Sequence, residues 1–225
     1  MLKKKLAPSE YLLIAANLLP VIGVWAWNWA PKEMFLVYCL ETIIIGILNL
    51  VRMAIVSLVK GKDTWYANGQ ATQQSGLLFM VFFLFHYGMF VAVQMAMFFS
   101  VSGIGKEAGI SMFNFFYKWP ELLHYDAMIV LGIFVLGYFY KMIIEFVMLG
   151  EHRTTSLMQL MFQPYGRIFI QQITVIVGSM FLMLGGGKIF ILVFAAVKIF
   201  FEMFVNYEAL IKKGMKDMEK KSGKQ

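Results

Sequence analysis

The most constraining feature of this chain is an apolar run, FMVFFLFHYGMFVAVQMAMFF, that extends from Phe79 to Phe99. At a rise of 1.5 Å per residue, about twenty apolar residues match the hydrocarbon thickness of a bilayer. One titratable side chain, His86, interrupts the run near its middle. A polar side chain at that depth normally faces other helices or a water-filled cavity. The run therefore predicts a membrane-spanning helix that borders a polar interior.

Composition places the chain among the integral membrane proteins. Hydrophobic residues make up 60% of it and charged residues 15%, whereas an ordinary globular domain carries about 25% charged residues. The net charge of +7 comes from basic residues at the termini and in loops, so it indicates membrane topology and no nucleic-acid partner. The single cysteine, Cys39, excludes an internal disulfide and any cysteine-based metal cluster.

Apolar stretches along the chain predict an all-α bundle of six transmembrane helices. Residues 1–211 form this domain, and the charged residues 212–225 are expected to be a frayed cytoplasmic tail. Residues 61–75 predict a polar loop. Residues 111–119 predict a segment resting in the lipid headgroups or, alternatively, a lid over an outward-facing pocket. The predicted spans cover residues 10–29, 33–60, 76–100, 122–149, 165–184 and 188–210.

Lysine and arginine residues are distributed unequally between the two sides of the predicted bundle. Thirteen lie on the side that holds both termini and four lie on the other. Because cytoplasmic loops carry an excess of basic residues, both termini are expected in the cytoplasm, with the chain a multi-pass protein of the inner (cytoplasmic) membrane. The thirteen are Lys3, Lys4, Lys5, Lys60, Lys62, Arg153, Arg167, Lys212, Lys213, Lys216, Lys220, Lys221 and Lys224, and the four are Lys32, Lys106, Lys118 and Lys188.

Polar residues recur at helical spacing along five of the six predicted spans, and such stripes are expected to converge inside the bundle. Counting the helical rise places His86, Thr174 and Glu202 at about the same depth. The stripes thus predict an intramembrane pocket for a small molecule or an ion. Its predicted lining residues are Glu41, Arg52, His86, Tyr87, Gln171, Thr174, Lys198 and Glu202.

The charged residues of the predicted spans also allow a purely structural interpretation. Three acids and three bases lie deep in the predicted spans, which is the balance that mutual neutralisation would produce. An unpaired charge at the centre of a membrane helix costs at least about 2.5–3.5 kcal/mol, so pairing is expected whether or not a ligand binds. The acids are Glu41, Glu145 and Glu202, and the bases are Arg52, Lys141 and Lys198.

The sequence indicates a metal site only weakly. Its candidate ligands are His86 and Glu202, but a lone buried histidine is more often a hydrogen-bonding residue than a metal ligand. The sequence contains no HExxH or CxxC motif and no paired-histidine spacing. It also contains no P-loop and no serine-protease motif. Neither a catalytic residue nor a cofactor is therefore predicted.

Three blocks of the sequence carry a resemblance. They are VYCLETIIIGILNLVRM (Val37–Met53), FFLFHYGMF (Phe82–Phe90) and QPYGRIFIQQITVIVG (Gln163–Gly178). Together they resemble an uncharacterised prokaryotic integral-membrane family that is catalogued as a domain of unknown function. The resemblance implies a six-helix bundle and carries no activity. Relatives in that family show further histidines where this chain has Gln94 and Gln172, so a histidine-rich metal centre, if the family has one, is expected to be lost here.

Three functional hypotheses remain open on the sequence. The first is a protein of the transport or carrier type that binds a small molecule or an ion in the predicted pocket. The second is a membrane-embedded enzyme that acts on a lipid-phase substrate, with or without the help of a metal ion. The third is a non-catalytic subunit of a membrane assembly, with an oligomer or another membrane protein as partner. A water-filled cavity favours the first two, and a dry core favours the third.

Overall fold

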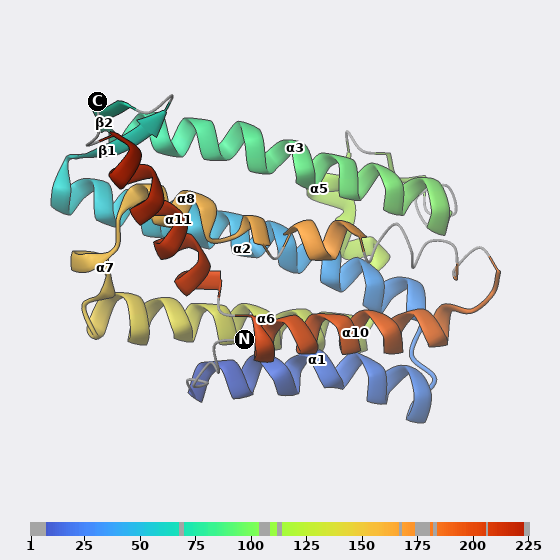
Figure 1. The fold of residues 1–225 in the computed structure, drawn as a ribbon. Helices are drawn as coiled ribbons and strands as arrows, with labels where there is room; N and C mark the ends of the chain where they lie inside the picture. Colours follow the sequence, from blue (N-terminus) through green and yellow to red (C-terminus); the bar gives the residue numbers. More distant parts are fainter. Residues whose placement is uncertain are drawn as a thin grey trace.

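The computed structural model describes residues 8–67, 70–103, 109–111, 114–166, 168–173, 181, 184–205 and 207–222. This part of the chain forms a bundle of long helices that run along a common direction, with a β-hairpin at one end (Figure 1). The elements in chain order are α1 (Pro8–Ala26), α2 (Pro31–Lys60), β1 (Lys62–Ala67), β2 (Gln70–Ser75), α3 (Gly76–Ser102), α5 (Phe115–Lys118), the 3-10 turn η1 (Trp119–Leu122), α6 (Tyr125–Lys141), the π-helical segment η2 (Met142–Met148), α7 (Glu151–Thr154), α8 (Leu157–Phe162), α10 (Gly187–Phe204) and α11 (Tyr207–Ser222).

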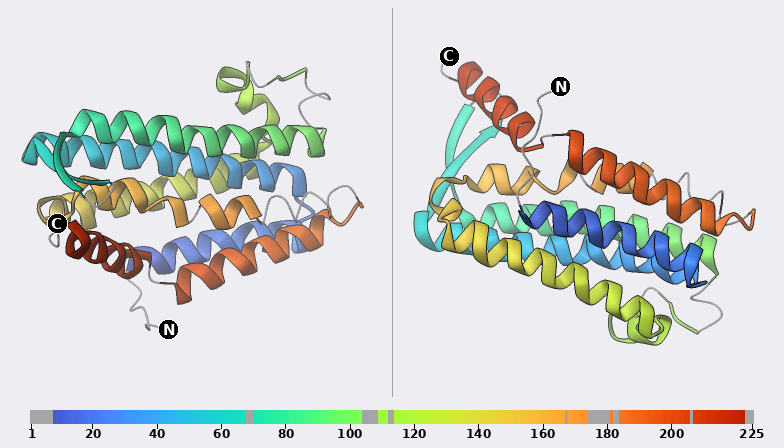
Figure 2. Two further views of the ribbon diagram at one scale, coloured as in Figure 1. Left: turned by 45° about the horizontal axis from the view of Figure 1, so that its top comes forward. Right: turned by 90° about the horizontal axis from the view of Figure 1, so that it is seen from below.

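Helix α2 lies at the centre of the bundle, where it contacts α3, α6, α8 and α10, while α1 packs against α6 and α10 (Figure 2). Pro31 begins α2, because the missing N–H of proline costs nothing in the first helical turn. Gly61 ends the helix with φ of 73°, a backbone conformation that glycine adopts without strain. Ser75 then caps α3 by accepting a hydrogen bond from the backbone N–H of Leu78.

Among the described residues, three helices are long and apolar enough to cross a membrane, namely Pro31–Lys60, Gly76–Ser100 and Tyr125–Met148. Helix α1 contributes a shorter apolar helix, Tyr11–Ala26. Large hydrophobic side chains cover the outer surface of these helices, and Phe85 and Leu136 are 75% and 70% exposed. Because water would solvate such a surface poorly, a bilayer is its natural surrounding. The predictions of an all-α fold and of a membrane protein are thus confirmed.

The fourth predicted span is described completely, and the fifth and sixth are described in part. The fourth corresponds to α6 and η2, which together cover Tyr125–Met148. Of the fifth, residues 165–166 and 168–173 are helical, and most of the remainder lies outside the described residues. Helix α10, in the sixth, ends at Phe204 rather than at residue 210, because Val205 has an extended backbone.

The expectation of a plain polar loop over residues 61–75 was wrong. Strands β1 and β2 form an antiparallel hairpin in which Lys62 pairs with Ser75 and Trp65 pairs with Thr72. The aromatic and β-branched residues of β1 favour a strand, because they pack well on a pleated surface. The Trp65 ring packs against Phe79 and Phe82 of α3, with centroid separations of 5.1 and 5.3 Å, and so fixes the hairpin to the bundle.

The expectation of a frayed tail after residue 211 was also wrong. Helix α11 runs from Tyr207 to Ser222, beside the hairpin and α8. Its apolar residues Met215 and Met218 pack against the core, while Lys212, Lys213, Lys216 and Lys220 stay exposed. Burial, together with the negative charges of Glu219 and Asp63, raises the pKa of Tyr66 above its ordinary value, consistent with α11 lying next to β1.

The buried apolar residues form two clusters along the bundle. The first cluster joins α1, α2, α6 and α10 around Phe35, Tyr38 and Phe194. The second cluster joins the C-terminal half of α2, the N-terminal half of α3 and α8 around Phe83 and Met161, at the end that carries the hairpin (Figure 1). Residues predicted to share one pocket are therefore distributed over two separately packed regions.

Candidate functional site

Glu41 is the centre of the strongest polar constellation in the described part of the chain. It lies on α2 with an exposed fraction of 0%. One carboxylate oxygen forms an ion pair with the Nζ of Lys198 on α10. The other accepts a hydrogen bond of 2.5 Å from the hydroxyl of Tyr138 on α6. Three helices are thus joined through one buried carboxylate.

Aromatic rings surround the positive partner of this ion pair. The Nζ of Lys198 lies 4.8 Å from the ring centroid of Tyr38 and 5.0 Å from that of Phe134. At these distances the ring faces attract a cation, and the attraction strengthens when water is excluded. The Tyr38 hydroxyl donates to the backbone oxygen of Asn17 at 3.1 Å, which ties α1 to the same constellation. We call Tyr38, Glu41, Tyr138 and Lys198 the Glu41 cluster.

Gln171 extends the Glu41 cluster toward the fifth predicted span. Its side-chain amide donates to the backbone oxygen of Tyr38 at 2.6 Å. The structure therefore brings together three of the predicted pocket residues, namely Glu41, Gln171 and Lys198. Tyr38 and Tyr138 were not predicted as site residues. Each lies at helical spacing from charged residues on its own helix, and that spacing is the signal that could have identified them.

The adjacent residues Tyr87 and His86 lie on two different sides of α3. Tyr87 is buried and donates its hydroxyl to the backbone oxygen of Thr42 at 2.8 Å. His86 is exposed, and its Nδ1 lies 2.7 Å from the hydroxyl of Tyr165. His86 therefore faces the segment after α8 and does not join the Glu41 cluster.

Arg52 lies in the second apolar region. Its guanidinium carbon is 5.2 Å from the ring centroid of Phe146 in η2. The neighbouring Glu145 forms an ion pair of 3.8 Å with Lys141, one helical turn earlier. An ion pair between Arg52 and an acid of another helix stays a prediction.

Two predicted site residues are not described. Thr174 lies outside the described residues, and so does the side chain of Glu202. The pairing of His86 with Glu202, and with it the metal hypothesis, therefore stays a prediction. Among the residues that the structure does describe, no group of three histidine, cysteine, aspartate or glutamate side chains could hold a metal ion.

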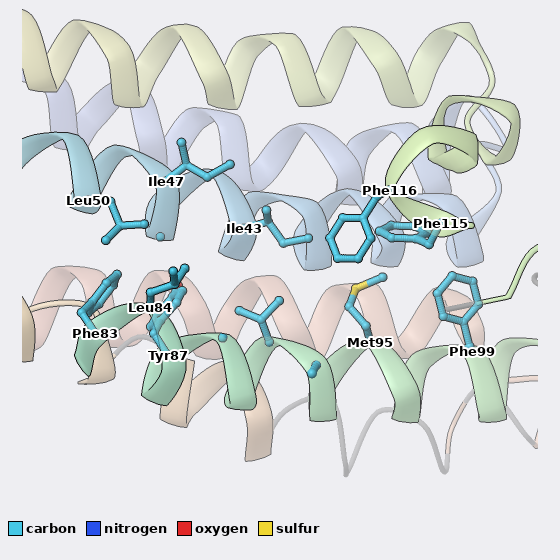
Figure 3. A pocket seen from close by; sticks show the side chains of 14 residues that line it. Ile43, Ile47, Leu50, Phe83, Leu84, Tyr87, Met95, Phe99, Phe115 and Phe116 are labelled. Atoms are coloured by element: carbon cyan, nitrogen blue, oxygen red, sulfur yellow. The ribbon is translucent and has the colours of Figure 1, made fainter. Parts of the chain in front are cut away.

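An apolar groove lies on the side of α2 away from the Glu41 cluster, between α2 and α3 (Figure 3). Its volume is about 300 Å³. One wall consists of α2 residues and the other of α3 residues, and the two aromatic side chains of Phe115 and Phe116 from α5 lie over one end. The remaining lining residues are Ile43, Gly46, Ile47, Leu50, Phe83, Leu84, Tyr87, Gly88, Val91, Ala92, Met95 and Phe99.

Two glycines shape the groove in opposite ways. A Cβ added at Gly46 would lie 2.5 Å from the Tyr87 ring, so this glycine lets α3 pack closely on α2. A Cβ added at Gly88 would meet nothing within 4 Å, so this glycine leaves the groove open. The polar stripes of the sequence predicted a polar pocket. The apolar groove was not predicted, since its residues resemble ordinary lipid-facing residues.

No curated protein and no solved structure matches the chain. One family model does match, over residues 1–224, and it is described as a family of unknown function (DUF6498). The sequence resemblance to an uncharacterised family is thereby confirmed. Because the match spans nearly all of the sequence, the chain belongs to the family of unknown function DUF6498.

Proposed function

We propose that the chain is a multi-pass protein of the cytoplasmic membrane, with six spans and both termini in the cytoplasm. The end of the bundle with the hairpin and α11 faces the cytoplasm, because basic residues gather there. Those in the described part of the chain are Lys60, Lys62, Arg153, Lys212, Lys213, Lys216 and Lys220. At the opposite end, the described residues contribute Lys32, Lys118 and Lys188.

Within that membrane the protein binds the apolar chain of an amphiphilic small molecule, and the groove between α2 and α3 is the observation that carries this proposal. Both helices are long and apolar enough to span a bilayer, so the groove is reached from the lipid phase. Its volume of about 300 Å³ falls at the lower end of the range for ligand pockets. Its walls are almost entirely hydrocarbon, so an apolar chain would be bound without desolvating a polar group.

The length of the groove favours a chain over a compact molecule. Lining residues on α3 extend from Phe83 to Phe99, which corresponds to about 24 Å along the helix axis. The hydrocarbon core of a bilayer is about 30 Å thick. A long acyl or isoprenoid chain aligned with the helices would therefore contact both walls over most of its length, with Phe115 and Phe116 closing over one end.

Two glycines provide a matched pair of variants to test this proposal. Gly88 lines the groove, whereas Gly132 lies on α6 outside it, and a Cβ would meet nothing at either position. We expect a fluorescent polyene fatty acid to bind the purified wild-type protein saturably. Gly88→Leu should weaken this binding at least about tenfold because the new side chain fills the groove, while Gly132→Leu should bind like wild type. Equal binding by Gly88→Leu and wild type would refute the proposal.

The Glu41 cluster favours a second candidate function, that of a non-catalytic assembly subunit. Its carboxylate is fully buried and already has a cationic and a hydroxyl partner, as internal stabilisation would require. In this alternative a partner protein covers the apolar outer surface. Purification in mild detergent would then yield a stoichiometric protein complex, and the fatty acid would not bind saturably.

A further inference from the structure

His86 presents a polar group to the lipid phase, at a depth where lipids offer few hydrogen-bond partners. The residue lies about 15 Å along α3 from Gly76 and about 24 Å from Ser102, well inside a helix that is apolar enough to span a membrane. Its side chain is nevertheless exposed. An unsatisfied polar group in hydrocarbon is costly, so this position calls for a partner.

The hydrogen bond to Tyr165 determines which nitrogen of His86 is available. The Tyr165 hydroxyl lies 2.7 Å from Nδ1. A phenol is a good donor and a neutral imidazole nitrogen a good acceptor, and in the tautomer in which Tyr165 donates to Nδ1 the proton of the imidazole resides on Nε2. Among the described residues, Nε2 has no hydrogen-bond partner. In this tautomer, the nitrogen of the exposed His86 side chain that has no described partner is a single N–H donor.

Aromatic rings pack around the His86 imidazole. Phe82 stacks on the imidazole with a centroid separation of 5.4 Å and an interplanar angle of 20°. Phe90 and Tyr165 approach it edge-on, at 5.3 and 5.0 Å. Phe162 adjoins Tyr165 at 6.1 Å. Flat π surfaces of this kind pack favourably against another flat ring, by stacking or edge-to-face contact.

We propose that His86 and these rings bind the head of a membrane-soluble quinone. A quinone carries carbonyl oxygens that accept a hydrogen bond, a flat ring that suits the aromatic walls, and an apolar tail that stays in the bilayer. An acyl chain offers no acceptor, and the carbonyl groups of phospholipids lie at the membrane interface. In the bound state the Nε2–H donates to one quinone carbonyl, and Tyr165 holds the imidazole in the required tautomer.

This quinone site is separate from the groove. Successive residues of a helix are rotated by about 100°, so Gly88, which lines the groove, lies on the opposite side of α3 from His86. A ligand at His86 therefore does not depend on the proposal for the groove. Failure of one proposal leaves the other standing.

The test is a titration of the full-length protein in neutral phospholipid nanodiscs with a decyl-tailed benzoquinone. Tryptophan fluorescence reports binding, because the Trp65 ring lies 5.3 Å from Phe82, which stacks on His86. We expect saturable binding by wild type and an affinity lower by about tenfold for His86→Leu, which loses one hydrogen bond in a low-dielectric site. The matched control Phe85→Leu changes an exposed residue of the same helix and should bind like wild type.

Two more variants keep the proposal testable if His86→Leu does not fold. His86→Gln restores an N–H donor and should recover part of the affinity, and Tyr165→Phe should weaken binding several-fold because it releases the tautomer. Decylbenzene, which has the same tail and no carbonyl, should not compete. Competition by decylbenzene, or unchanged affinity in both His86→Leu and Tyr165→Phe, would overturn the proposal.

Discussion

Replacing Lys198 by methionine tests whether the Glu41 cluster stabilises the bundle through charge neutralisation. Methionine keeps most of the apolar stem of the lysine but removes the positive charge. Glu41 would then remain fully buried with Tyr138 as its hydrogen-bond donor. Removing one partner of a buried ion pair typically costs about 3–5 kcal/mol, mostly because the remaining charge is uncompensated.

That free-energy loss is large enough to measure as a melting temperature in detergent. One kcal/mol corresponds to about 2–4 °C in a protein of this size, so Lys198→Met should lower the Tm by roughly 6–20 °C. Glu41→Gln should cost less, because Lys198 still lies over two aromatic rings and is partly exposed. The comparison variant is Lys118→Met, which removes a lysine of α5 far from the Glu41 cluster.

The double variant Glu41→Gln/Lys198→Met distinguishes stabilisation by charge neutralisation from stabilisation by side-chain packing alone. It carries no charge at positions 41 and 198, and the glutamine still offers an oxygen to the Tyr138 hydroxyl. We therefore expect it to melt above Lys198→Met, with a strongly non-additive cycle. If the double variant loses the sum of the two single losses, or if Lys198→Met melts like Lys118→Met, the reasoning is refuted.

Three further predictions concern other parts of the molecule. Ser111 is exposed beside α5, so Ser111→Cys should be labelled by a membrane-impermeant thiol reagent added at the outer face. Cys39 should stay unlabelled because it is buried. Labelling of Ser111→Cys from the cytoplasm alone would contradict the proposed topology. Arg52→Ala should lower the Tm more than Lys118→Ala, because Arg52 lies over Phe146 and is expected to pair with an acid of another helix; equal melting temperatures would contradict this pairing. Gly46→Ala should destabilise the protein by about 1–3 kcal/mol, because the new Cβ would lie 2.5 Å from Tyr87 and displace its hydroxyl from Thr42, while Gly88→Ala should melt like wild type.

Hydrophobic runs were sufficient to predict the membrane class and the long helices, because burial of apolar residues in a bilayer depends on composition and length alone. Helical phase also placed Glu41 and Lys198 inside the bundle, since charged groups in hydrocarbon must find partners. The helical phase of one span does not specify which neighbouring helix its polar stripe faces. His86 was therefore assigned to the central pocket, although in the structure it faces Tyr165. The hairpin and α11 were missed because their stability comes from Trp65 and Met215 packing against distant segments.

The groove shows most clearly what sequence patterns leave undetermined. Ile43, Gly46 and Ile47 could equally face lipid or another helix, since both surroundings are apolar. Glu41 determines which side of α2 faces the other helices, because its ion pair with Lys198 and its hydrogen bond from Tyr138 orient one side of α2 toward α10 and α6. The opposite side of α2 is thereby presented to α3, where Tyr87 packs over Gly46 and the open position at Gly88 leaves space. The buried ion pair thus orients the wall of the groove without touching it, so we expect substitutions in the Glu41 cluster to change ligand binding only through stability, and substitutions at Gly88 to change it directly.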